Sequence, residues 1–136
     1  MMLNNKAEII TYFNSVWAER PEAAIGLVII EFLAMHIDSA KQYSIATFFD
    51  VAKQVSGQEK NAVLNVVNYL SGSDLNLLAV NVELIEDNEV FMLDDEQVVA
   101  AKNMINPRTG EIDPDIKSKL FLIFSPSDMA KKILRG

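Results

Sequence analysis

The stretch that decides the fold runs from Ser44 to Asp94 and reads SIATFFDVAKQVSGQEKNAVLNVVNYLSGSDLNLLAVNVELIEDNEVFMLD. Its first part repeats apolar residues at the spacing of one helix face, from Ile45 through Val55. Ser44 stands where a hydroxyl can cap that helix, and Gly57 can end it without a Cβ penalty. We therefore predict a helix that begins after Ser44 and ends before Gly57.

A second helix is expected after a tight turn. Ser56 and Glu59 have the S-x-x-E spacing of a capping box, which places a helix start here. Apolar residues at helical spacing follow, and SGSD at 71–74 has turn chemistry. The predicted second helix covers residues 58–70, with Ala62, Val63, Val66, Val67 and Leu70 on its inner face.

A two-stranded ribbon is predicted next. From Leu78 to Ile85, apolar residues alternate with others at period two, which is typical of a strand. Glu86-Asp87-Asn88-Glu89 is a polar turn in which Asn88 can take positive φ. The chain then returns from Val90 to Leu93 as the second strand.

A helix, a short turn, a second helix and a hairpin, in this order over residues 44–94, resemble a winged helix-turn-helix domain. The resemblance implies that the second helix faces the major groove of DNA. Its outward residues would then contact nucleic acid, and asparagine can bond bidentately to adenine. These candidate nucleic-acid contacts are Lys60, Asn61, Asn65 and Asn68. An exposed polar helix face without any ligand would carry the same residues.

The charge pattern disfavours that activity. The net charge is −7, and residues 61–101 hold eight acidic side chains and no Lys or Arg. Residues 1–60 balance to −2 and residues 102–136 to +3. Affinity for DNA comes largely from Lys and Arg contacts to phosphates. The predicted second helix offers Lys60 alone, and the ribbon tip would repel a phosphate backbone.

The same pattern favours a protein–protein interaction module. An acidic ribbon can select a basic partner, since complementary charge sets partner choice and encounter rate. We expect a protein partner or self-association, with a dimer or a larger complex as the assembled form. The candidate partner-binding residues are Glu83, Glu86, Asp87 and Glu89. The alternatives are a solubilising acidic surface and a DNA-binding transcriptional regulator.

The rest of the chain is predicted to be helical. We expect a helix over residues 5–19, which Asn5 with Glu8 can cap, and a second helix over 22–37. The second is so apolar that it is either buried or partly a subunit interface. The stretch 38–43 is predicted to be a linker.

A helix is also expected over 95–105, which Asp94 with Gln97 can cap, and another from Asp113-Pro114 through Phe124. The stretch 106–115 holds two prolines and a glycine and is predicted to be a surface break in the chain. A last helix is expected after Ser125, with Ser125 as its cap and Pro126 at its first position. The prediction is a mostly helical α+β fold and a single domain over 1–136, divided as 1–43, 44–94 and 95–136.

Composition limits the function classes. The chain has 136 residues, half of them apolar, and no cysteine. These values favour a globular protein from a reducing compartment, and we expect a cytoplasmic protein without a signal peptide or a membrane span. His36 is the only histidine, and no nucleophile elbow or phosphate-cradling glycine loop is present. We therefore expect no enzymatic activity, no cofactor and no metal site.

Overall fold

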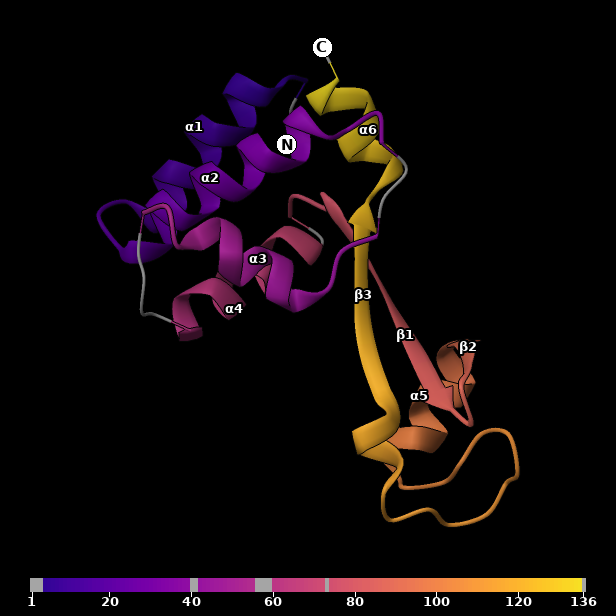
Figure 1. Cartoon of the computed structure of the whole chain (residues 1–136). Helices are drawn as coiled ribbons and strands as arrows, with labels where there is room; N and C mark the ends of the chain where they lie inside the picture. Colours follow the sequence, from indigo (N-terminus) through magenta and orange to yellow (C-terminus); the bar gives the residue numbers. More distant parts are fainter. Residues whose placement is uncertain (1–3, 40–41, 56–59, 73, 136) are drawn as a thin grey trace. The chain divides into compact units, whose positions relative to one another are not determined.

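The computed structural model describes residues 4–39, 42–55, 60–72 and 74–135. Over these ranges the chain contains six α-helices and a three-stranded antiparallel sheet, so the fold is α+β and mostly α, as predicted (Figure 1). The chain divides into two compact units. Unit 1 comprises residues 1–79 and 124–136, and unit 2 comprises residues 80–123. The prediction of a single domain stays a prediction.

Unit 1 is a helical bundle. Its helices are α1 (Lys6–Trp17), α2 (Pro21–Met35), α3 (Ile45–Ala52), α4 (Lys60–Ser71) and α6 (Asp128–Leu134). The side chain of Asn5 accepts a hydrogen bond from the Glu8 backbone N–H at 2.9 Å, which caps α1 as the sequence predicts. Ser44 lies at the start of α3 but makes no capping bond through its side chain. The predicted capping box of Ser56 and Glu59 lies outside the described residues.

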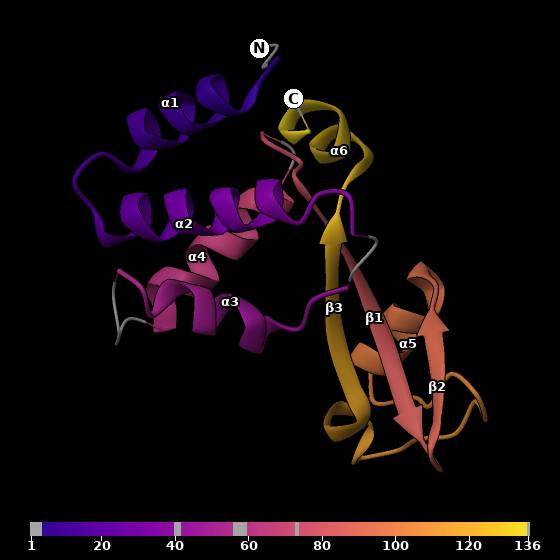
Figure 2. The ribbon, with the colours of Figure 1, turned by 45° about the horizontal axis from the view of Figure 1, so that its top comes forward.

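The core of unit 1 forms around α2, which packs against α1, α3 and α4. Figure 2 shows α1 running alongside α2. The two helices approach closely where the Phe13 ring lies over Gly26, because a Cβ on Gly26 would be only 2.0 Å from that ring. Ile25, Ile29 and Leu33 are fully buried. The high apolar content of α2 therefore reflects burial in the core.

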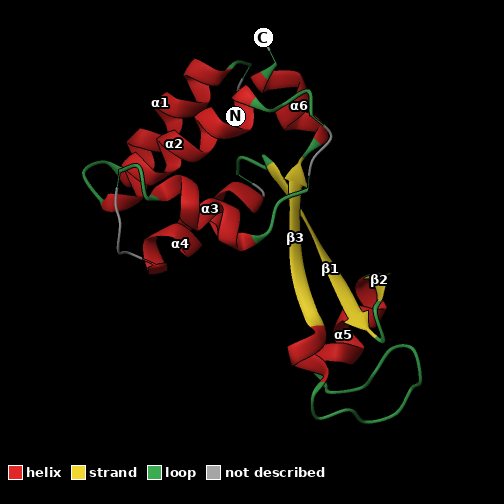
Figure 3. Cartoon of the chain, viewed as in Figure 1, coloured by secondary structure: helices red, strands yellow, loops and turns green. Residues whose placement is uncertain are grey.

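Unit 2 is built on the sheet, whose strand order is β2-β1-β3. The strands are β1 (Leu78–Glu86), β2 (Glu89–Leu93) and β3 (Leu120–Pro126), so β1 and β3 begin or end in unit 1. Helix α5 (Asp95–Lys102) follows β2, and a 3-10 turn η1 (Ile116–Lys119) precedes β3. Figure 3 draws the intervening residues mainly as loop. Asp94 and Gln97 form the predicted capping box of α5, with bonds of 2.8 and 2.9 Å.

The prediction of a helix from Asp113 through Phe124 is wrong. Residues 116–119 form η1, and Leu120–Pro126 form β3. A short apolar run fits a buried helix segment or a strand equally well by periodicity, and here pairing with β1 decides for the strand. The sheet therefore has three strands, not two.

The start of the last helix was also predicted wrongly. Ser127, not Ser125, caps α6, and its Oγ accepts from the Ala130 N–H at 3.0 Å. Pro126 ends β3 rather than opening the helix. The stretch predicted as a plain linker, 38–43, also contains a buried residue. Tyr43 forms an antiparallel bridge with Phe124 in unit 1, with backbone N–O distances of 2.7 and 2.8 Å.

Among the described residues, no helix combines the length and the apolar content that a bilayer crossing needs.

Candidate functional site

The hairpin of β1 and β2 carries the four predicted partner-binding acids. The turn residues Asp87 and Asn88 both have positive φ, 55° and 65°, as a two-residue hairpin turn requires. Glu86 and Glu89 pair across the turn as cross-strand neighbours. The turn is therefore one residue shorter at each end than the predicted 86–89.

The structure does not bring the four acids together on one surface. Side chains alternate between the two faces of a strand, so Glu83 lies on the face opposite to Glu86. Asp87 and Glu89 are exposed, and Glu83 is half-buried. Glu86 differs from them, because its side chain is only 15% exposed and is surrounded by cations.

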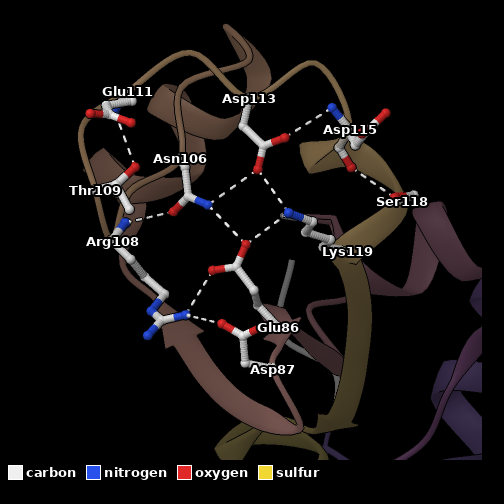
Figure 4. Close-up of polar contacts among 10 residues, drawn as sticks. All are labelled: Glu86, Asp87, Asn106, Arg108, Thr109, Glu111, Asp113, Asp115, Ser118 and Lys119. Atoms are coloured by element: carbon white, nitrogen blue, oxygen red, sulfur yellow. Dashed lines mark hydrogen bonds and ion pairs between the residues drawn. The ribbon is translucent and has the colours of Figure 1, made fainter.

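Glu86 is the centre of a polar cluster made of Glu86, Asn106, Arg108, Asp113 and Lys119 (Figure 4). Arg108 Nη1 lies 2.7 Å from Glu86 Oε1, and Lys119 Nζ lies 2.8 Å from Glu86 Oε2. The same Lys119 Nζ lies 2.9 Å from Asp113 Oδ2. The two carboxylates are therefore bridged by one ammonium group.

Asn106 closes the polar cluster from the loop. It is only 4% exposed, and its Nδ2 donates to Glu86 at 3.1 Å and to Asp113 at 3.2 Å. Its Oδ1 accepts from the Arg108 backbone N–H at 2.9 Å. The side-chain amide of Asn106 therefore uses both its donor and its acceptor groups within the cluster, as a buried polar group must.

The contacts of the polar cluster favour its charged state. The hydrogen bond from Lys119 is the main cause that lowers the pKa of both Glu86 and Asp113, despite partial desolvation. Hydrogen bonds to Glu86 and Asp113 in turn raise the pKa of Lys119. With two carboxylates, one ammonium and one guanidinium, the polar cluster has no net charge. Its geometry holds the 106–113 loop to the end of β1.

The two faces of the hairpin differ in what they contact. On one face, Leu84 and Leu93 are buried against residues of α5 and η1, including Ala101 and Ile116. The Arg108 guanidinium also stacks there, 4.1 Å from the centre of the Phe91 ring. This side is the packed face of unit 2.

The other side, which we call the open face, consists of Glu83, Ile85, Val90 and Met92. The register pairs Ile85 with Val90 and Glu83 with Met92, so the four side chains are direct neighbours. Val90 is 58% exposed, Met92 49% and Ile85 38%. Three large, partly exposed apolar side chains thus lie together beside the carboxylate of Glu83.

The predicted nucleic-acid contacts are on the outer side of α4. Lys60, Asn61, Asn65 and Asn68 are all exposed. With Arg20 and Glu22, the first three line a hollow on the surface of unit 1. Asn65 is already engaged there, because its Nδ2 donates to the buried carboxylate of Glu22 at 3.0 Å, a bond that lowers the pKa of Glu22.

Sequence reasoning missed Asn106, Arg108 and Lys119. Asn106-Pro107 was visible as the start of a loop, and the loop has charges of both signs. Their partner, Glu86, is 20 to 33 positions away in the sequence. Local patterns carry no information on such distant pairs.

No metal site was predicted, and in the described ranges no group of three or more His, Asp or Glu side chains is arranged to hold a metal ion. His36 ends α2 with its ring 4.7 Å from that of Phe32.

Comparison with known proteins adds no relative: no protein-family model matches the chain, and neither a curated protein nor a solved structure matches it significantly.

Proposed function

We propose that this protein is a non-enzymatic protein–protein interaction module and that the open face of unit 2 is its contact surface. The observation that carries the proposal is the group of exposed apolar side chains, Ile85, Val90 and Met92, with acidic neighbours. Contiguous exposed apolar surface rimmed by polar residues is typical of interaction sites. Residues 80–101 contain no Lys or Arg, so the expected partner surface is apolar and basic.

A winged-helix-like arrangement of unit 1 fits this proposal as its scaffold. The helix pair α3 and α4 packs together and is followed by β1. The sheet has two strand pairs, the hairpin β1–β2 and the non-consecutive pair β1–β3, and of the three described strands β1 and β3 contribute residues to unit 1. Tyr43, just ahead of α3, also pairs with β3 through Phe124. We infer that β1 and β3 correspond to the two strands of a wing, and that β2, α5 and η1 are a segment inserted between these strands in the sequence.

Charge supports the interaction role of that insertion. Unit 2 has ten acidic and four basic side chains, a balance of −6. Two of the four candidate acids, Glu83 and Glu89, lie outside the polar cluster, and Asp87 contacts it only through Arg108, at 3.9 Å. Glu86 is engaged by Arg108 and Lys119, and we assign it to the scaffold of the hairpin rather than to a partner.

The test compares two exposed methionines. The tagged full chain is purified from its native cells as wild type, as Met92→Asp and as Met129→Asp. Met92 is 49% exposed on the open face, and Met129 is 44% exposed on α6. We expect a co-purifying protein that is retained by Met129→Asp and lost from Met92→Asp. Equal retention by both variants would contradict the proposal.

DNA binding remains the second candidate, because Lys60, Asn61 and Asn68 are exposed on α4, and Asn68 lies two helical turns after Asn61. The buried Glu22 carboxylate beside Asn65 opposes it electrostatically. The discriminating measurement is a gel shift of random duplex DNA at several salt concentrations. A salt-dependent shift that Lys60→Ala abolishes would favour the regulator over the interaction module.

A further inference from the structure

Strand β2 is an edge strand, and no other strand of the described residues pairs with its outer side. In the order β2-β1-β3 it has a neighbour on one side only. Residues flanking a two-residue hairpin turn exchange hydrogen bonds, and the bonded pairs then alternate. From the register, Glu89, Phe91 and Leu93 direct their backbone groups toward β1. Val90 and Met92 therefore direct their N–H and C=O groups outward.

These outward groups have no backbone partner within the described ranges. The side chains of the same two residues, Val90 and Met92, are the most exposed apolar ones of the open face. A free backbone edge beside an apolar face is what an added strand requires, because main-chain bonds give affinity and alternate side chains give specificity.

Carboxylates stand at both ends of this edge. Asp87 and Glu89 lie at the turn end, and Asp94, Asp95 and Glu96 follow at the other. Among the described residues, only Asp87 of these five has an ion-pair partner, Arg108 at 3.9 Å. An added strand with an apolar centre and cations at both ends would match the edge along its whole length.

The same charges disfavour a second copy of this chain as the occupant. Antiparallel pairing of β2 with itself about Phe91 would place Glu89 of one copy opposite Leu93 of the other, with Asp94 one position further along. Carboxylates of both copies would then gather at each end of the pair, and nearby like charges repel each other. A basic strand from another protein meets no such repulsion.

We propose that unit 2 binds its partner by strand addition, with an extended apolar segment flanked by Lys or Arg pairing with the outer edge of β2. This inference rests on the proposed function and specifies the partner and the binding mode. Val90 and Met92 supply the backbone bonds and the apolar contact. Glu89 and Asp94 supply charge at the two ends.

The test uses the full chain and a nine-residue peptide with alternating valine and threonine in its centre and two lysines at each end. Amide exchange followed by NMR should show that the peptide protects the amides of Val90 and Met92. Met92→Pro removes one outward N–H without touching a bond to β1, whereas Met92→Thr keeps the N–H. We expect Met92→Pro to weaken peptide binding about tenfold more than Met92→Thr, since a buried acceptor is left unsatisfied.

A charge variant keeps the test independent of any folding defect in Met92→Pro. Glu89→Lys should weaken the lysine peptide and strengthen a peptide in which glutamate replaces lysine. Equal affinity of the wild type for the lysine peptide and the glutamate peptide would contradict the proposal that the partner strand is basic. Protection of Val90 and Met92 that rises with protein concentration alone would overturn it in favour of a second copy.

The two proposals fail in different ways. If no peptide protects the two outward amides, or if Met92→Pro and Met92→Thr weaken binding equally, strand addition is wrong. The open face could still bind a native partner by side chains, which the loss of co-purification with Met92→Asp would reveal. If that partner is retained by Met92→Asp, the proposed function itself fails.

Discussion

Each of the two units is stabilised by a different kind of internal interaction. In the described residues, the core of unit 1 contains 22 buried apolar side chains, drawn from all five of its helices and from β1 and β3. The core of unit 2 has four, Leu84, Leu93, Ala101 and Ile116. A segment of about 40 residues buries too little surface for a large core, so it needs other supports. In unit 2 the polar cluster is such a support.

The largest effect is expected where the helices of unit 1 approach most closely. In Gly26→Ala the new Cβ would lie 2.0 Å from the Phe13 ring, which also contacts the Tyr69 ring at 5.8 Å between centres. Because the ring is fully packed, α1 must shift, and overpacking of this severity costs about 3 kcal/mol or more. Thermal unfolding of Gly72→Ala is the matched control, since its Cβ would approach no atom closer than 3.4 Å. Similar melting temperatures for the two variants would contradict the packing at Phe13.

A smaller and more local effect is expected in unit 2. Lys119→Met removes the ammonium that bridges Glu86 and Asp113, and the two carboxylates then repel each other. Amide exchange should rise in the 103–115 loop and at the end of β1, while the amides of α2 keep their protection. The pKa values of Glu86 and Asp113 should rise toward ordinary values.

The control is Lys117→Met, two positions away on the same turn. Lys117 is exposed and forms no ion pair with any described residue. An increase in loop exchange that is equal in Lys117→Met and Lys119→Met would show that the polar cluster does not hold the loop.

The sequence predicts the elements whose signals are local. The caps at Asn5 and at Asp94 with Gln97 act within one helical turn, and the turn at Asn88 needs only its own backbone preference. The elements that depend on distant pairing were missed. The segment Leu120–Pro126 becomes a strand because β1 provides its hydrogen-bonding partners, and the residues of the segment alone do not predict this pairing.

The candidate site divides in the same way. Alternation along β1 and β2 already implies that Ile85 and Met92 do not share a face with Leu84 and Leu93. The register then places Ile85 opposite Val90 and Met92 opposite Glu83. The role of Glu86 could not be predicted. Its negative charge looked identical to that of Asp87 and Glu89 until Arg108 and Lys119 were brought beside it from a loop and a turn that follow.

The smallest expected effect is a difference between the two units in the pH at which acid disrupts their structure. Glu86 and Asp113 have lowered pKa values, so they contribute stability that is present above their ordinary values of 4.5 and 3.8 and is lost as the pH falls through their lower folded values. Lys119 has a raised pKa, so its contribution is complete below its ordinary value of 10.5 and is lost only above it. Acidification below about pH 4 should therefore release the 103–115 loop by neutralising both carboxylates.

Unit 1 should lose its structure only at a lower pH, because its large apolar core does not titrate, although Glu22 in this unit also has a lowered pKa. Trp17 is the only tryptophan and packs against Tyr69 in unit 1, so its fluorescence reports on that unit alone. Amide exchange in unit 2 should rise at a higher pH than the one at which Trp17 emission changes. In Lys119→Met the separate step in unit 2 should vanish, because the loop is already released at neutral pH. If Trp17 emission in the wild type changes at a higher pH than amide exchange in unit 2, the polar cluster is not more sensitive to acid than the core of unit 1.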